Sequence, residues 1–79
     1  MNIYIGNLSE KIQDLHLKEA FTEYGQVLKA KVIVDRFTGL SKGFGFIEMP
    51  NEVEASKAIK TLNGGTLEGK VIKVNQAFK

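Results

Sequence analysis

Apolar residues in this chain follow two different spacings in a set order, and that order restricts the fold more than any other feature of the sequence. Residues 1–8 and 27–34 are β-prone, as expected of strands. Between them, residues 14–24 carry apolar side chains at positions 17, 20, 21 and 24, the spacing of an amphipathic helix. The same plan recurs as a strand, a helix and a strand at residues 44–49, 51–62 and 71–76. The predicted order is therefore strand, helix, strand, strand, helix, strand.

Glycine and asparagine mark the ends of the two predicted helices. Gly25 follows the first helix, at a position where a helix commonly ends in a left-handed conformation. Asn51 precedes the second helix and Glu54 follows three residues later, which is typical of a helix start. Residues 63–65 (Asn-Gly-Gly) end this helix, and the segment 66–70 is predicted to be a turn-rich connector.

The order of elements predicts the topology. Right-handed crossovers place both helices on one face of the sheet. The expected fold is α+β, a ferredoxin-like split β-α-β arrangement with a four-stranded antiparallel sheet and two helices on one face. Its first and third strands are central neighbours, and its other face is uncovered. With 79 residues and no cysteine there is no room for a second core, so residues 1–79 are predicted to form a single domain.

The uncovered face is predicted to carry aromatic rings. Ile3 and Ile5 are needed in the core, which turns Tyr4 outward. Alternation in the third strand puts Lys42, Phe44, Phe46 and Glu48 on one face, and Gly43, Gly45, Ile47 and Met49 on the other. A slipped register would bury both phenylalanines, but also a lysine and a glutamate without partners, so the cost of burial favours the exposed arrangement.

The distribution of charge supports a ligand on that face. The chain carries a net charge of +2, while residues 9–24 hold four acidic residues and two lysines, and residues 50–62 hold two of each. The helical side is therefore acidic to neutral, and the strands and loops are basic. Exposed rings stack on nucleic-acid bases and lysines meet phosphates, which favours single-stranded RNA, or single-stranded DNA, as the ligand.

Two segments resemble the motifs of a known family. Residues 3–8 (Ile-Tyr-Ile-Gly-Asn-Leu) and 42–49 (Lys-Gly-Phe-Gly-Phe-Ile-Glu-Met) are similar to the two ribonucleoprotein motifs of the RNA-recognition motif family. The family usually has an aromatic residue where this chain has Met49, which alternation turns inward. A single such domain starting almost at Met1 resembles the short RNA-binding proteins of bacteria, including cyanobacteria, and less closely the glycine-rich RNA-binding proteins of plants.

The resemblance implies a role for each residue of the open face. Tyr4 and Phe46 would stack on successive bases, Phe44 would lie against sugars and Lys42 would pair with a phosphate. Two to four nucleotides would be bound. The other RNA-binding residues expected are Asn2, Lys31, Ile33, Glu48, Lys73, Asn75, Gln76 and Lys79, with Ala77 and Phe78 continuing the surface beyond the last strand.

Several other functions are disfavoured by composition. The chain has no cysteine and one histidine, His16, which argues against disulfides, thiol catalysis and a zinc site. No nucleophile is paired with a base, so no enzyme, metal or cofactor is predicted. Apolar runs reach only three residues and no secretory leader begins the chain, so no membrane span and a cytoplasmic location are predicted.

Two alternatives remain open beside a non-catalytic RNA-binding module. The same fold can dock a protein partner through its helices or its sheet. A small ferredoxin-like hydrolase such as an acylphosphatase would need an anion-binding arginine loop, and Arg36 is the single arginine of the chain. Arg36 and Phe37 lie in the polar loop 35–42, where they either reach over bound RNA or close the hairpin.

Overall fold

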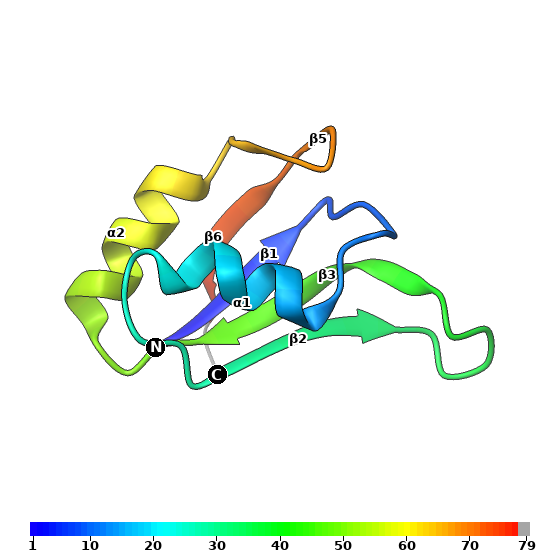
Figure 1. The fold of residues 1–79 in the computed structure, drawn as a ribbon, viewed down its shortest axis with the longest axis horizontal. Helices are drawn as coiled ribbons and strands as arrows, with labels where there is room; N and C mark the ends of the chain where they lie inside the picture. The colour runs from blue at the N-terminus through cyan, green and yellow to red at the C-terminus, as the bar shows by residue number, and fades with distance from the viewer. Residues whose placement is uncertain (78–79) are drawn as a thin grey trace.

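The computed structural model describes residues 1–77 and has the predicted α+β architecture (Figure 1). Its main sheet is antiparallel with the strand order β2-β3-β1-β6, so β1 and β3 are the central neighbours. A two-stranded sheet, β4-β5, is separate from it. The elements are β1 (Asn2–Gly6), α1 (Asp14–Thr22), β2 (Lys29–Val34), β3 (Ser41–Glu48), α2 (Glu52–Leu62), β4 (Thr66–Leu67), β5 (Lys70–Val71) and β6 (Lys73–Ala77).

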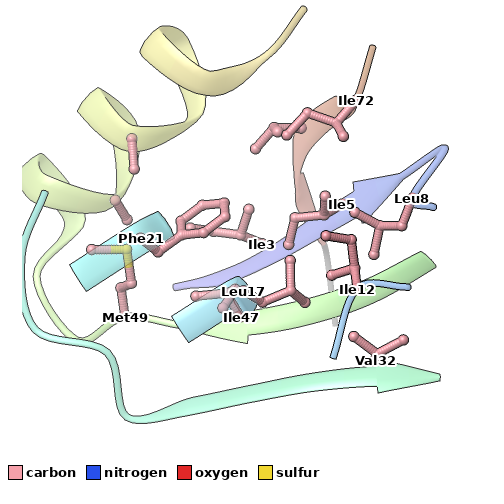
Figure 2. Close-up of a cluster of buried hydrophobic side chains, with 13 residues drawn as sticks. Ile3, Ile5, Leu8, Ile12, Leu17, Phe21, Val32, Ile47, Met49 and Ile72 are labelled. Carbon is pink, nitrogen blue, oxygen red and sulfur yellow. The ribbon is translucent and has the colours of Figure 1, made fainter. Parts of the chain in front are cut away.

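The core lies between the helices and one face of the sheet (Figure 2). Ile3 and Ile5 of β1 are fully buried, and so are Leu17 and Phe21 of α1. Met49 is also fully buried, as the alternation predicted. The slipped register is therefore wrong, since it would expose the inward residues of β3. The complete buried set is Ile3, Ile5, Leu8, Ile12, Leu17, Phe21, Val32, Ile47, Met49, Ala55, Ala58, Ile72 and Val74.

The end of the first helix differs from the prediction. Helix α1 stops at Thr22, and Gly25 has φ 158°, which is close to extended and is not the left-handed conformation expected of it. Glycine is required there for space, because a Cβ would collide with the carboxylate of Glu54. That carboxylate accepts a hydrogen bond from the backbone N–H of Gln26 at 3.3 Å. The contact joins the end of α1 to the start of α2.

The connector after α2 is more ordered than predicted. It forms the hairpin β4-β5, with Glu68 (φ 50°) and Gly69 (φ 80°) at its tip, a backbone suited to a tight two-residue turn. Val71 pairs with Thr66 in this hairpin, so the last strand of the main sheet begins at Lys73 and not at Val71.

Both edges of the main sheet are tied to a helix end. The Asp14 carboxylate, at the start of α1, accepts from the backbone N–H of Val32 in β2 at 2.7 Å. Asn63, which ends α2, accepts through its side-chain oxygen from the N–H of Val74 in β6 at 2.9 Å. Unpaired backbone N–H groups on edge strands can pair with other chains, and each of these bonds satisfies one such group. They also anchor the two outer strands beside the open face.

Candidate nucleic-acid interface

The face of the sheet opposite the helices, called here the open face, is a grid of side chains in register. Its central row runs across β2, β3, β1 and β6, and a second row flanks it on the side where β1 begins. A shorter third row lies on the other side, where β1 ends. The central row is Lys31, Phe46, Tyr4 and Asn75. The second row is Lys29, Glu48, Asn2 and Ala77, and the third row is Phe44, Gly6 and Lys73.

Three rings form the aromatic cluster at the centre of the grid: Tyr4, Phe44 and Phe46. Their centroids are 5.8 to 6.0 Å apart, and the pair Phe44–Phe46 is nearly perpendicular at 87°. Each ring therefore contacts the other two while the cluster keeps a surface open to solvent, and Phe46 is 38% exposed. Isolated exposed aromatics are common on protein surfaces, but a contiguous cluster marks a binding site.

Gly6 makes room for the tyrosine ring. A Cβ at this position would lie 2.6 Å from the Tyr4 hydroxyl oxygen and 2.9 Å from Cε2 of the ring. Gly6 pairs with Phe44 in β3, so the missing side chain leaves room for the Tyr4 ring beside Phe44, to which it is inclined by 32°. The position of the tyrosine ring thus depends on a glycine two residues along the same strand.

We expect Gly6→Ala to displace the Tyr4 ring and to weaken the binding of single-stranded RNA about 5-fold, a part of what one stacked base contributes. Fluorescence anisotropy with a labelled oligonucleotide measures the change. In a Tyr4→Ala background the same substitution should have no further effect, because the ring it displaces is gone. Equal losses in both backgrounds would contradict this role for Gly6.

The two glycines of β3 have different structural roles. Gly45 faces the core, where a Cβ would be 2.6 Å from the Lys31 carbonyl oxygen and 3.0 Å from Cδ1 of Leu17. Gly43 has φ 87°, and near it the β2-β3 register shifts between Val32 and Val34. Gly45 thus permits a close approach of β2, and Gly43 lies where the register of the strand pair shifts.

Lysines flank the aromatic cluster within the grid, with Lys31 in the central row and Lys73 in the third row. Lys31, Lys42 and Lys73 are exposed, and the sequence had assigned all three to this surface. Lys29 is also exposed on the open face, opposite Glu48, and was missed. The signal for it was available, since Lys29 and Lys31 are two residues apart in a strand.

Beside Phe46 the open face is hollowed. Its lining is formed by Asn2, Lys29, Lys31, Ile33, Phe46, Ile47, Glu48 and Ala77. The hollow thus combines apolar and charged side chains, and Ile33 and Glu48 are half-buried. Such a shape can accept the edge of a flat polar ring.

Two of the predicted residues lie elsewhere or outside the described chain. Gln76 pairs with the buried Ile3, so its side chain points to the helix side of the sheet, beside α2, and not to the open face. The prediction had continued the surface along the strand without applying its alternation. Lys79 and Phe78 lie outside residues 1–77, which the structure describes.

The loop between β2 and β3 is closed by an aspartate. The Asp35 carboxylate accepts from the backbone N–H groups of Phe37 at 2.7 Å and Thr38 at 3.1 Å, and the Gly39 N–H donates to the Asp35 carbonyl at 2.7 Å. The Phe37 ring is 91% exposed, so it does not close the hairpin by packing.

Neither a metal-binding cluster nor a membrane-spanning helix is found in the part of the chain that the structure describes. Within residues 1–77, no three acidic or histidine side chains are grouped to hold a metal ion. In the same residues, no helix is long and apolar enough to cross a membrane.

Known proteins resemble this chain in sequence and in fold. A family model described as RNA recognition motif matches residues 3–73. The chain is 48% identical over 75 residues to a 28 kDa chloroplastic ribonucleoprotein of Nicotiana sylvestris, covering 95% of this chain and 27% of that protein. The crystal structure of RNA Binding Protein PG1 superimposes with a TM-score of 0.97 at 42% identity, over 100% of this chain and 95% of that one. A structure of the Rna15 RRM with bound RNA (GU) gives 0.87 at 26% identity, over 99% and 83%.

The predicted cytoplasmic location is wrong against these comparisons. The ribonucleoproteins of Nicotiana sylvestris and Arabidopsis thaliana that are 47% to 48% identical to this chain are chloroplastic. Targeting is carried by segments that are not part of a folded domain, so the residues of the domain do not reveal it. These relatives are plant proteins and not the short bacterial proteins that a single domain resembles first, and the chain spans about a quarter of the relatives' length.

Proposed function

Because this chain belongs to the RNA recognition motif family, we propose that residues 1–79 act as one non-catalytic module that binds two to four nucleotides of single-stranded RNA across the open face. The aromatic cluster is the observation that carries this proposal, since three rings in mutual contact lie outside the buried core and remain partly exposed in a small domain. RNA bases splayed from a single strand stack on such rings. The relative from Nicotiana sylvestris is named a ribonucleoprotein, and the Rna15 RRM was solved with RNA.

The geometry supports different contacts with RNA for the three rings of the cluster. Tyr4 and Phe46 are direct neighbours across β1 and β3, so they offer two adjacent rings to two successive bases. Phe44, inclined by 32° to the Tyr4 ring and in the next row, is suited to contact the sugars between them. Lys42, Lys31 and Lys73 surround these rings and would neutralise the backbone phosphates of the bound strand.

A role as a protein-docking module is not favoured. A surface used only to dock a protein does not require three aromatic rings in mutual contact with lysines beside them. Hydrolysis of an acyl phosphate is not supported either, because the open face carries no arginine to hold the anion. The curated relatives are named as ribonucleoproteins and RNA-binding proteins, in agreement with a module that binds without catalysis.

The test is a titration of the isotope-labelled chain with short RNA oligonucleotides, followed by amide chemical shifts. We expect the largest shifts in β1 and β3, with smaller shifts in β2 and β6 and little change on the exposed sides of α1 and α2. Shifts confined to the helices, or none with mixed-sequence oligonucleotides, would overturn the proposed function.

We also expect a shallow dependence of binding on salt. With two to four phosphates neutralised, the plot of log K against log salt concentration should have a slope of about −1.5 to −3. Lys42→Gln should make the slope about 0.7 less steep, because one phosphate contact is lost. Lys57→Gln, on the exposed side of α2, is the matched control and should leave it unchanged. The same slope for both variants would remove Lys42 from the phosphate contacts.

A further inference from the structure

Glu48 is out of place on a surface that binds a polyanion. It lies on the open face, half-buried, between Lys29 on one side and Asn2 on the other. We call Lys29, Glu48 and Asn2 the polar row. Opposite side chains in antiparallel strands are about 5 Å apart at Cβ, so the three polar groups act on the same space. A carboxylate there repels the phosphates that the neighbouring lysines attract.

The carboxylate has only acceptors, which restricts what it can bind. It cannot contact a phosphate or a carbonyl oxygen, so on a bound RNA strand its partners are the ribose 2′-hydroxyls and the N–H groups of a base, and only the N–H groups differ from one base to another. Adenine and cytosine each present one exocyclic amino group, and uracil presents one imino N–H. Guanine alone presents an imino N–H and an amino group side by side on its Watson–Crick edge. Those two donors match the two oxygens of a carboxylate in a bidentate contact.

The hollow beside Phe46 is where such a base edge fits. Glu48 and Asn2 line it together with the apolar side chains of Ile33 and Phe46. Lys29 lies opposite the carboxylate and carries three N–H donors, which complement the carbonyl oxygen that guanine presents beside its imino group. The polar row thus offers, on adjacent strands, the acceptors and the donor that the guanine edge requires.

We propose that the polar row is a guanine-selective subsite, in which Glu48 accepts from the imino and amino groups of one guanine and Lys29 donates to its carbonyl oxygen. This proposal rests on the proposed function, since the guanine belongs to the strand stacked on Tyr4 and Phe46. It adds a base preference to a surface whose stacking rings accept any base. The negative charge of Glu48 then contributes to specificity, because its repulsion of phosphates weakens binding unless a guanine occupies the subsite.

The experiment compares four labelled probes by fluorescence anisotropy. Each is a seven-nucleotide oligouridine whose central residue is guanosine, inosine, adenosine or uridine. We expect the guanosine probe to bind about 10-fold more tightly than the uridine probe, as for one bidentate base contact. Inosine lacks the amino group and keeps the imino group, so its affinity should be intermediate. Inosine binding as tightly as guanosine would overturn the bidentate contact.

Three variants separate base recognition from charge. Glu48→Gln should weaken the guanosine probe and strengthen the uridine probe, because the double acceptor and the repulsion of phosphates are both lost. Glu48→Asp keeps the charge and withdraws the carboxylate, so it should remove the preference without strengthening uridine binding. Glu19→Gln, an equal charge change on the exposed side of α1, is the control and should keep the preference.

The outcomes distinguish this proposal from the one on which it rests. If Glu48→Gln strengthens all four probes equally, Glu48 acts only through its charge and the guanine subsite is overturned. Equal binding of the four probes by the unmodified chain would overturn the subsite while leaving the stacking surface intact. Failure of every probe to bind would overturn the proposed function together with the subsite.

Discussion

Replacing Phe46 by alanine is expected to weaken the binding of single-stranded RNA by about 5- to 150-fold, because one base loses its stacking partner. Phe46 is in contact with both other rings of the aromatic cluster and is the most exposed of the three. Its loss also removes one of the apolar side chains that line the hollow beside the polar row. The effect is measured as the change in the dissociation constant for a short oligonucleotide.

The same substitution should leave the fold intact. Phe46 points away from the buried set, so thermal unfolding of the variant should differ little from that of the original chain. Phe46→Tyr keeps the ring and serves as the control, with binding close to the original. RNA binding that is unaffected by Phe46→Ala would contradict the proposed function.

A second large effect is expected for stability, at Gly45. Gly45→Ala places a Cβ 2.6 Å from the Lys31 carbonyl oxygen and 3.2 Å from Cα of Val32, and backbone atoms have little freedom to move away. The strand pair β2-β3 must separate locally, and the free energy of unfolding should fall by about 3 kcal/mol. Chemical denaturation measures this loss.

Gly39→Ala is the matched control for Gly45. Gly39 lies in the β2-β3 loop, where a Cβ would have no atom within 4 Å, but its φ of 76° is unfavourable for alanine. That variant should lose only about 1 kcal/mol, the usual cost of the strained backbone. Equal losses at the two positions would mean that backbone conformation, and not the close contact with β2, explains the glycine at 45.

The aromatic surface was predictable because two requirements agreed. Alternation in β3 places Phe44 and Phe46 on the same face as Lys42 and Glu48, and the cost of burying those two charges excludes the slipped register. The structure confirms this with Met49 fully buried and Phe46 exposed. No knowledge of neighbouring strands was needed, since all of these residues belong to one segment of the chain.

Predictions that depended on where a strand starts were less successful. Val71 was assigned to the last strand because it is β-branched, but a tight turn at Glu68 and Gly69 pairs it with Thr66 instead. Gln76 was expected to continue the RNA-binding surface beyond Asn75, and its pairing with Ile3 turns its side chain to the helix side of the sheet. Turn geometry and strand register are set by the partner strand, which local propensity does not describe.

The sequence by itself determined the order of elements, the composition of the core and the presence of three rings on the open face, because burial and alternation are properties of each segment alone. Only the tertiary structure decided which residues share a row. Lys29, Glu48 and Asn2 come from three strands far apart in the chain, and the pairing of β2, β3 and β1 brings them together. The stacking surface follows from local pattern, whereas the polar row proposed to select a base follows from strand register.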